Sequence, residues 1–310
     1  MSAVRPQPDP DTTGQDRAPA ERRGLKKGLY LVPSLFTAVN IFAGFYSVMS
    51  TMRGFQFLAT GRAAEAPGYF DYAAIAIGWA VLCDILDGRV ARMTRTTTEI
   101  GIQLDSIADV VSFGVAPALL AYVWGYGTVV QESNAQYLSW FLSFVYLICG
   151  GFRLARFNVQ ASRPRLLAEG KTKVDKKSFV GLPIPVAGGM IAAIVHLEPT
   201  PLVQYFQYEP HRAEIFAGLM MVLVGCLSVL MVSTMRFSSL KTVGTTVRSA
   251  RVIILTVAMA VLIYLYSRWI LLVIASGYIL HGLLSRLIAS VQRRQEPARV
   301  DAANPDSVGP

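Results

Sequence analysis

The sequence predicts an all-α, polytopic integral membrane protein with about eight transmembrane helices. Hydrophobic residues make up 53% of the 310 residues and charged residues only 16%, whereas soluble domains carry about 25% charged residues. The apolar residues also gather in stretches of about twenty, which is the helix length that crosses a hydrocarbon core of ~30 Å. Both observations favour a helix bundle in a lipid bilayer over a water-soluble fold.

Eight apolar stretches define the expected spans, which we place at 30–52, 70–93, 105–127, 137–157, 180–198, 213–235, 250–266 and 269–290. The last two need a break between them, because residues 252–284 are almost continuously apolar. A single helix of that length, at 1.5 Å per residue, would measure roughly 50 Å and would exceed the bilayer core. We place the break at Ser267, Arg268 and Trp269, where the nearby tyrosines are typical of an interfacial aromatic belt.

The two ends of the chain are expected to lie outside the membrane. Residues 1–25 are polar, proline-rich and charged, and they lack the apolar segment of a signal peptide. We therefore expect a disordered cytoplasmic tail there, and the composition of residues 292–310 predicts a second one. Between the tails we expect a main membrane domain at 26–235 and an additional helix pair at 236–291.

The net charge of +9 is distributed unevenly along the chain. Lysine and arginine are frequent before the first span, in alternate loops and after the last span, and they are sparse in the other loops. This alternation is the positive-inside pattern. It predicts a protein of the inner (cell) membrane with both termini, and the link between the second and third spans, on the cytoplasmic side. Because the basic residues lie in short loops, we expect no nucleic-acid partner.

Four aspartates stand where the second span ends and the third begins. Asp84 and Asp87 are three residues apart, and Asp105 and Asp109 are four residues apart. Both spacings place side chains on one face of a helix. Two antiparallel helices joined by a short loop, in which we expect Gly101, would bring the two pairs together at the cytoplasmic membrane surface.

Clustered carboxylates in a membrane protein require compensating cations. One aspartate at the centre of a membrane helix costs about 2.5–3.5 kcal/mol, and neighbouring carboxylates repel one another. A salt-bridge cluster with Arg89, Arg92 and Arg95 is one solution. Divalent metal is the other, and oxygen ligands without cysteine or histidine suit Mg²⁺, Mn²⁺ or Ca²⁺ better than zinc. Two such ions, the number that four carboxylates formally neutralise, are suited to displacement at phosphorus.

The spacing Asp84-x₂-Asp87-Gly88-x₂-Ala91-Arg92-x₈-Gly101-x₃-Asp105-x₃-Asp109 resembles the signature of the CDP-alcohol phosphotransferases at every fixed position. Four further runs resemble the members of that family that use serine: PSLFTAVNIFAGF, DSIADVVSFGVAPALL, GGFRLARFNV and FVGLPIPVAGG. Together they cover most of residues 30–190. The first span departs from the family, because Pro33 is followed by Ser34 where the family often has asparagine.

The resemblance implies transfer of the phosphatidyl group of CDP-diacylglycerol to an alcohol, with release of CMP. It implies that Asp84, Asp87 and Asp105 hold two divalent cations, Mg²⁺ or Mn²⁺, and that Asp109 is both a ligand and the general base. It implies that the CDP headgroup is contacted by Gly88, Ala91, Arg92, Thr98, Gly101 and Thr37. The family also implies a homodimer.

The acceptor alcohol is predicted from the run RLARFN at 153–158. Within the resemblance this run favours L-serine over glycerol 3-phosphate, inositol phosphate or choline. Arg153, Arg156 and Asn158 would lie at the cytoplasmic end of the fourth span, where an arginine can bind a carboxylate through two hydrogen bonds. Anchoring of the helix by positive charge is the alternative for these arginines. A divalent-cation transporter is the rival function, although it gives the Asp-Gly-x₂-Ala-Arg pattern no purpose.

Overall fold

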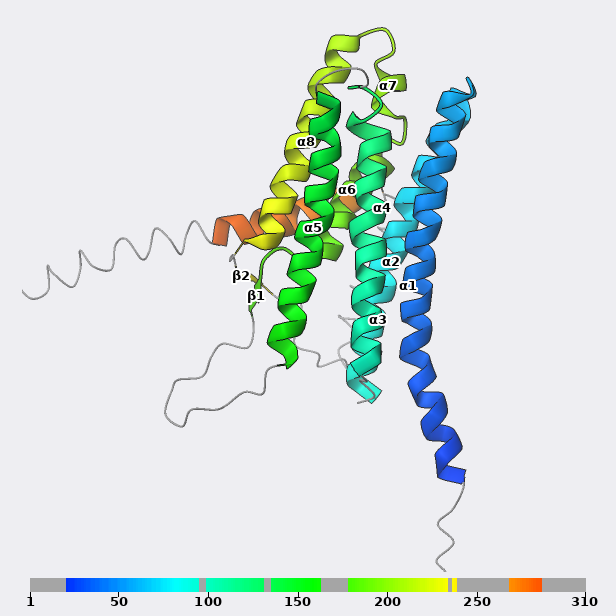
Figure 1. The fold of residues 1–310 in the computed structure, drawn as a ribbon, viewed down its shortest axis with the longest axis vertical. Helices are drawn as coiled ribbons and strands as arrows, with labels where there is room; N and C mark the ends of the chain where they lie inside the picture. Colours follow the sequence, from blue (N-terminus) through cyan, green and yellow to red (C-terminus); the bar gives the residue numbers. More distant parts are fainter. Residues whose placement is uncertain are drawn as a thin grey trace, which may run out of the picture.

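A computed structural model of the chain describes residues 21–94, 99–130, 135–162, 178–233, 236–238 and 268–285. These residues are almost entirely helical (Figure 1), which confirms the all-α class. The helical segments among them that are long and apolar enough to cross a membrane are Leu35–Ala59, Ala63–Leu86, Ile100–Tyr126, Ala135–Val159, Ile184–Tyr205, Pro210–Val232 and Arg268–Ser285. They match seven of the eight expected spans, and the remaining one, 250–266, lies outside the described residues.

The first two helices, α1 (Glu21–Ala59) and α2 (Ala66–Thr94), form an antiparallel pair. The turn between them contains Gly61, whose φ of 77° favours glycine, and the short 3₁₀ helix η1 (Ala63–Glu65). Helix α1 begins inside the stretch expected to be disordered. Its first residues are mostly Glu, Arg, Leu and Lys, which have high helix propensity, so the helix extends beyond the apolar run.

The third span is continuous but changes its helical type three times. It consists of α3 (Glu99–Asp109), the π-helical η2 (Val110–Val115), α4 (Ala116–Leu120) and the π-helical η3 (Ala121–Tyr126). Gly101 therefore lies within α3, and its expected place in the joining loop is wrong, because the helix begins six residues before the predicted span start at 105.

A proline inside this span is accommodated by a hydrogen bond from a neighbouring helix. Pro117 has no N–H to donate to the carbonyl of Phe113, which lies four residues earlier. The hydroxyl of Tyr146, a fully buried residue of α5, donates to that carbonyl at 3.1 Å. The freed backbone oxygen is thus satisfied inside the bundle, as a membrane environment requires.

The bundle is completed by α5 (Ala135–Ser162), α6 (Ile184–Leu197), the short α7 (Leu202–Tyr205) and α8 (Pro210–Val232). Helix α6 packs against α2, and α8 packs against α5. Two three-residue strands, β1 (Ser178–Val180) and β2 (Arg236–Ser238), pair antiparallel with Phe179 opposite Phe237. This pair joins the segment before α6 to the segment after α8, and it is the one departure from helix among the elements of the described chain.

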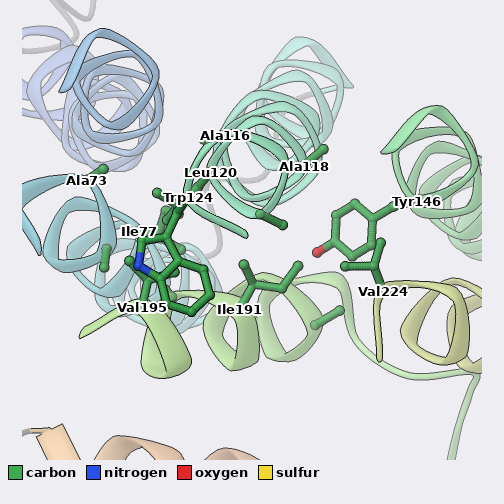
Figure 2. Packing of buried hydrophobic residues seen from close by; sticks show 14 of the residues in the cluster. Ala73, Ile77, Ala116, Ala118, Leu120, Trp124, Tyr146, Ile191, Val195 and Val224 are labelled. Carbon is green, nitrogen blue, oxygen red and sulfur yellow. The ribbon is translucent and has the colours of Figure 1, made fainter. Parts of the chain in front are cut away.

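The apolar core lies around α6. Figure 2 shows Ile191 and Val195 of α6 near Trp124, Ile77 and Tyr146, which come from three other elements. Helix Arg268–Ser285, orange in Figure 1, runs across the other helices rather than along them. It contacts the core through Tyr278 and Ile279, so its apolar sequence fits a span while its direction differs from that of the other six.

Candidate active site

The structure brings together three of the four predicted metal ligands. Asp84 lies on α2, and Asp105 and Asp109 lie on α3. One carboxylate oxygen of each lies within 4.8 Å of those of the other two. Asp87 lies one turn further along α2, but its side chain is outside the part of the chain that the structure describes. The carboxylates of Asp84, Asp105 and Asp109 are named the acidic cluster below.

The acidic cluster is partly removed from solvent. Asp109 is 8% exposed, and its Oδ1 atom is buried without a hydrogen-bond partner among the described residues. Asp84 and Asp105 are half-buried and repel the Asp109 carboxylate, whereas Arg153 of α5 attracts it. Burial of charge is costly unless partners or bound ions compensate it. The all-oxygen donor set and the unbonded oxygen of Asp109 fit a hard divalent cation.

A residue that the sequence analysis did not include also faces this cluster. Asn40 of α1 is 1% exposed, it lies beside Asp109, and neither atom of its side-chain amide meets a hydrogen-bond partner in the described chain. An amide oxygen is a suitable ligand for a hard cation, and an amide N–H can donate to a carboxylate. Asn40 is therefore a further candidate for holding either a metal or the Asp109 side chain.

Close packing of α1 against η2 positions Asn40. The Ser112 hydroxyl donates to the Asn40 carbonyl at 2.8 Å, and a side chain at Gly44 would overlap Ser112. The sequence carries a signal for this contact: the buried small and polar residues of α1 recur at helical spacing, as Thr37, Asn40, Gly44, Ser47 and Thr51. Such a stripe within a membrane span indicates a face turned to the bundle interior.

The predicted CDP contacts lie on the same elements. Gly88, Ala91 and Arg92 are in α2, where their side-chain surroundings are outside the description, and Thr98 lies outside the described residues. Gly101 is one turn before Asp105 on α3. Thr37 is buried on α1, three residues before Asn40 and on the same helix face. Thr37 is thus the predicted headgroup contact that shares a helix face with Asn40, the residue beside Asp109.

The three predicted acceptor-binding residues point to different partners. Arg153 faces Asp109, and its Nε atom is buried with no hydrogen-bond partner in the described residues. Arg156 donates to the backbone carbonyls of Val232 and Ser233 at 3.2 and 3.4 Å, where α8 ends. Asn158 donates through Nδ2 to the hydroxyl of Ser106 at 2.8 Å. Arg153 therefore interacts with the acidic cluster, through Asp109 and Asp84.

Comparison with known proteins identifies relatives that cover the part of the chain containing the acidic cluster. A family model described as CDP-alcohol phosphatidyltransferase matches residues 30–216. The CDP-diacylglycerol–serine O-phosphatidyltransferase of Helicobacter pylori (strain J99) is 32% identical over 265 residues, which is 85% of this chain and 94% of that protein. The Saccharomyces cerevisiae protein of the same name is 38% identical over 161 residues, 52% of this chain and 51% of its own. An archaetidylserine synthase of Methanothermobacter thermautotrophicus is 30% identical over 215 residues, 69% of this chain and 72% of its own.

Proposed function

The chain belongs to the CDP-alcohol phosphatidyltransferase family, and we propose on that premise that it transfers the phosphatidyl group of CDP-diacylglycerol to the hydroxyl of L-serine. The products are phosphatidylserine and CMP. The observation that carries this proposal is the meeting of Asp84, Asp105 and Asp109 from two helices, at the spacing of the family signature. The names of the relatives favour serine as the acceptor.

Asp84, Asp87, Asp105 and Asp109 would hold two divalent cations, Mg²⁺ or Mn²⁺. Bound cations would neutralise the pyrophosphate of the CDP-lipid and stabilise CMP as the leaving group. The donor set supports this, since carboxylate oxygens are the ligands that such ions prefer. Asn40 supplies an additional buried oxygen beside Asp109.

The CDP headgroup would lie along the adjoining faces of α1, α2 and α3. Small residues at Gly88, Ala91 and Gly101 allow a bulky group to approach the helix backbone. Arg92, Thr98 and Thr37 supply hydrogen-bond donors for phosphate or sugar oxygens. The family resemblance assigns these contacts, and the burial of Thr37 beside Asn40 is consistent with its part in them.

Asp109 would act as the general base. A carboxylate that accepts the proton of the serine hydroxyl must come within about 3 Å of it. A carboxylate has two oxygens, so Asp109 would accept the proton on one of them while the other contributes to the metal site. Arg153, which faces Asp109, would bind the serine carboxylate and so orient the hydroxyl toward the base.

The protein would lie in the cell membrane with the acidic cluster on the cytoplasmic side. The distribution of lysine and arginine supports this orientation. Serine would then arrive from the cytoplasm, and CDP-diacylglycerol would enter sideways from the bilayer. The homodimer implied by the family resemblance stays a prediction that analytical ultracentrifugation in detergent would test.

The function is tested by measuring CMP release from CDP-diacylglycerol by the purified protein in detergent micelles, with and without serine. Release that depends on serine and Mn²⁺, and that EDTA abolishes, supports the proposal. CMP release with glycerol 3-phosphate or inositol phosphate, and not with serine, would mean that the protein catalyses the same transfer to a different acceptor. Metal flux into liposomes with no CMP release would favour the transporter instead.

A further inference from the structure

An apolar groove of about 370 Å³ lies between α1 and α2, within the range of ~300–1,000 Å³ that small-molecule sites occupy. Its floor is formed by small buried residues, Ala43, Ala76 and Cys83, which are 7–8% exposed. Its walls are large side chains such as Phe42 and Trp79, which are 66% and 61% exposed. In a membrane-spanning helix pair, these walls face the lipid, so the groove opens toward the bilayer.

On both helices the lining of the groove ends one residue, in sequence, from a residue of the acidic cluster or its neighbour Asn40. On α2 its lining starts at Cys83, the residue before Asp84, and on α1 it starts at Val39, the residue before Asn40. From there it follows α2 to Tyr72, eleven residues away, and α1 to Tyr46, seven residues away. At a rise of 1.5 Å per residue these distances are about 16 and 10 Å.

The length and direction of the groove match one leaflet of a bilayer. Half of a hydrocarbon core of ~30 Å is about 15 Å. A lipid whose phosphates lie at the acidic cluster has its acyl chains starting at that level and running into the same leaflet. The groove starts about one residue along each helix from that level, leads away from the cluster and is lined mainly by apolar side chains, with Tyr46 and Tyr72 at its far end.

We propose that the groove between α1 and α2 holds one acyl chain of the CDP-linked lipid while its pyrophosphate lies at the acidic cluster. This inference rests on the proposed function. Transfer of an acyl chain from lipid to the groove gains little hydrophobic free energy, because both surroundings are apolar. The groove would act instead through packing contacts and by fixing the direction in which the pyrophosphate meets Asp84 and Asp109.

The first test compares two substrates that differ only in chain length. CDP-diacylglycerol with palmitoyl chains can fill the groove, whereas the butyryl compound cannot. Trp79→Ala removes a wall, and Ala76→Leu fills the floor. Each should lower kcat/KM for the palmitoyl substrate about tenfold, equivalent to about 1.4 kcal/mol, and should leave the butyryl value within about twofold.

Matched controls lie on helices that do not form the groove. Phe144 of α5 is exposed like Trp79, and Cys226 of α8 is small and exposed, so Phe144→Ala and Cys226→Leu should change neither substrate's kcat/KM. If Trp79→Ala lowers kcat/KM equally for the palmitoyl and butyryl substrates, Trp79 contributes to helix packing and not to acyl-chain binding. No loss for either would place the acyl chain elsewhere. Both results overturn the proposal while leaving the enzymatic function standing.

The second test does not depend on turnover. CDP-diacylglycerol with a diazirine at the end of one acyl chain is photolysed with the protein in nanodiscs, and the labelled peptides are identified by mass spectrometry. Label within residues 39–46 or 72–83 that unlabelled CDP-diacylglycerol displaces supports the proposal, even if CMP release fails. Equal labelling by a diazirine phosphatidylcholine would show a general lipid contact, and label elsewhere would show another path. Both outcomes overturn it.

Discussion

Asp109 combines several properties that distinguish it from the other carboxylates of the acidic cluster. It is the most buried of the three, it ends α3 immediately before the π-helical η2, and it faces both Arg153 and Asn40. π-helical turns are frequent at functional sites. The proposed base therefore lies on α3 among side chains from α1 and α5.

Replacement of Asp109 by asparagine should nearly abolish turnover. Asparagine keeps the size of the side chain but cannot accept the serine proton, and a general base contributes about 10²–10⁴ in rate. The measurement is kcat for CMP release at saturating Mn²⁺, with Mn²⁺ binding followed by electron paramagnetic resonance. Asp71→Asn is the matched control, because Asp71 pairs with His196 instead of joining the cluster. Near-normal turnover with Mn²⁺ bound would remove Asp109 from the base role.

Arg153 and Arg156 should respond differently to lysine. Lysine cannot form the paired hydrogen bonds of a guanidinium with a carboxylate, so Arg153→Lys should raise the KM for serine about tenfold with little change in that for CDP-diacylglycerol. Arg156→Lys weakens bonds to the end of α8 and should lower the melting temperature at an unchanged serine KM. Initial rates at varied serine, and thermal unfolding in detergent, check both. If instead Arg156→Lys raises the KM for serine and Arg153→Lys does not, Arg156 is the acceptor-binding residue.

The acidic cluster could be predicted from sequence because its spacing is local. Residues three and four apart share a helix face, and a short link makes consecutive helices antiparallel, so the meeting of Asp84 with Asp109 followed from the pattern. Asn40 could not be assigned in the same way, because its contact with Asp109 joins α1 to a helix much later in the chain. Two partners of Arg156 are backbone carbonyl groups. Every residue has such a group, so the sequence does not indicate which carbonyls an arginine will contact.

Helices α2 and α6 are joined by a polar contact far from the acidic cluster. His196, near the end of α6, lies 2.6 Å through Nδ1 from Oδ1 of Asp71 on α2. His196 is 8% exposed, so each partner satisfies a group that would otherwise be largely removed from water. This contact fixes the two helices relative to each other at the end of the bundle opposite to Asp84.

Removal of the imidazole should destabilise the bundle without impairing chemistry. His196→Leu leaves the Asp71 carboxylate without this partner, and because Asp71 is 21% exposed we expect a cost of about 1 kcal/mol, the lower end for such a loss. The melting temperature in detergent should fall, while the KM for serine stays unchanged. His211→Leu is the control, because His211 is exposed at the start of α8. An unaltered melting temperature would mean that the contact adds no stability.

Spans were easier to predict than their internal structure. Hydropathy is averaged over some twenty residues, so seven expected spans were recovered within the described residues although their ends shifted. The same average hides a start at Glu99 instead of 105, and it cannot reveal the π-helical turns within the span. Mean hydropathy also does not predict how a helix is oriented: helix Arg268–Ser285 is apolar but runs across the other helices (Figure 1).

The orientation of the whole protein follows from charge and has a direct test. In a background without the native cysteines, Gly170→Cys lies in the lysine- and arginine-rich link after the fourth span, and Ala64→Cys lies in the exposed turn after α1. A membrane-impermeant maleimide should label Ala64→Cys in intact cells and Gly170→Cys only after permeabilisation. Labelling of position 170 from outside would reverse the proposed topology.

The π-helical η2 bears on how this part of the chain tolerates changes in length. A π turn closes its hydrogen bonds over five residues where an α turn uses four, so it holds one residue in excess. Deleting one residue between Val110 and Val115 could restore a regular α-helix without rotating the segments on either side. A homologue with one residue fewer here would thus keep the counterparts of Asp109 and Pro117 on the same helix faces as in this chain. Sequence alignments should therefore allow a one-residue gap at this point.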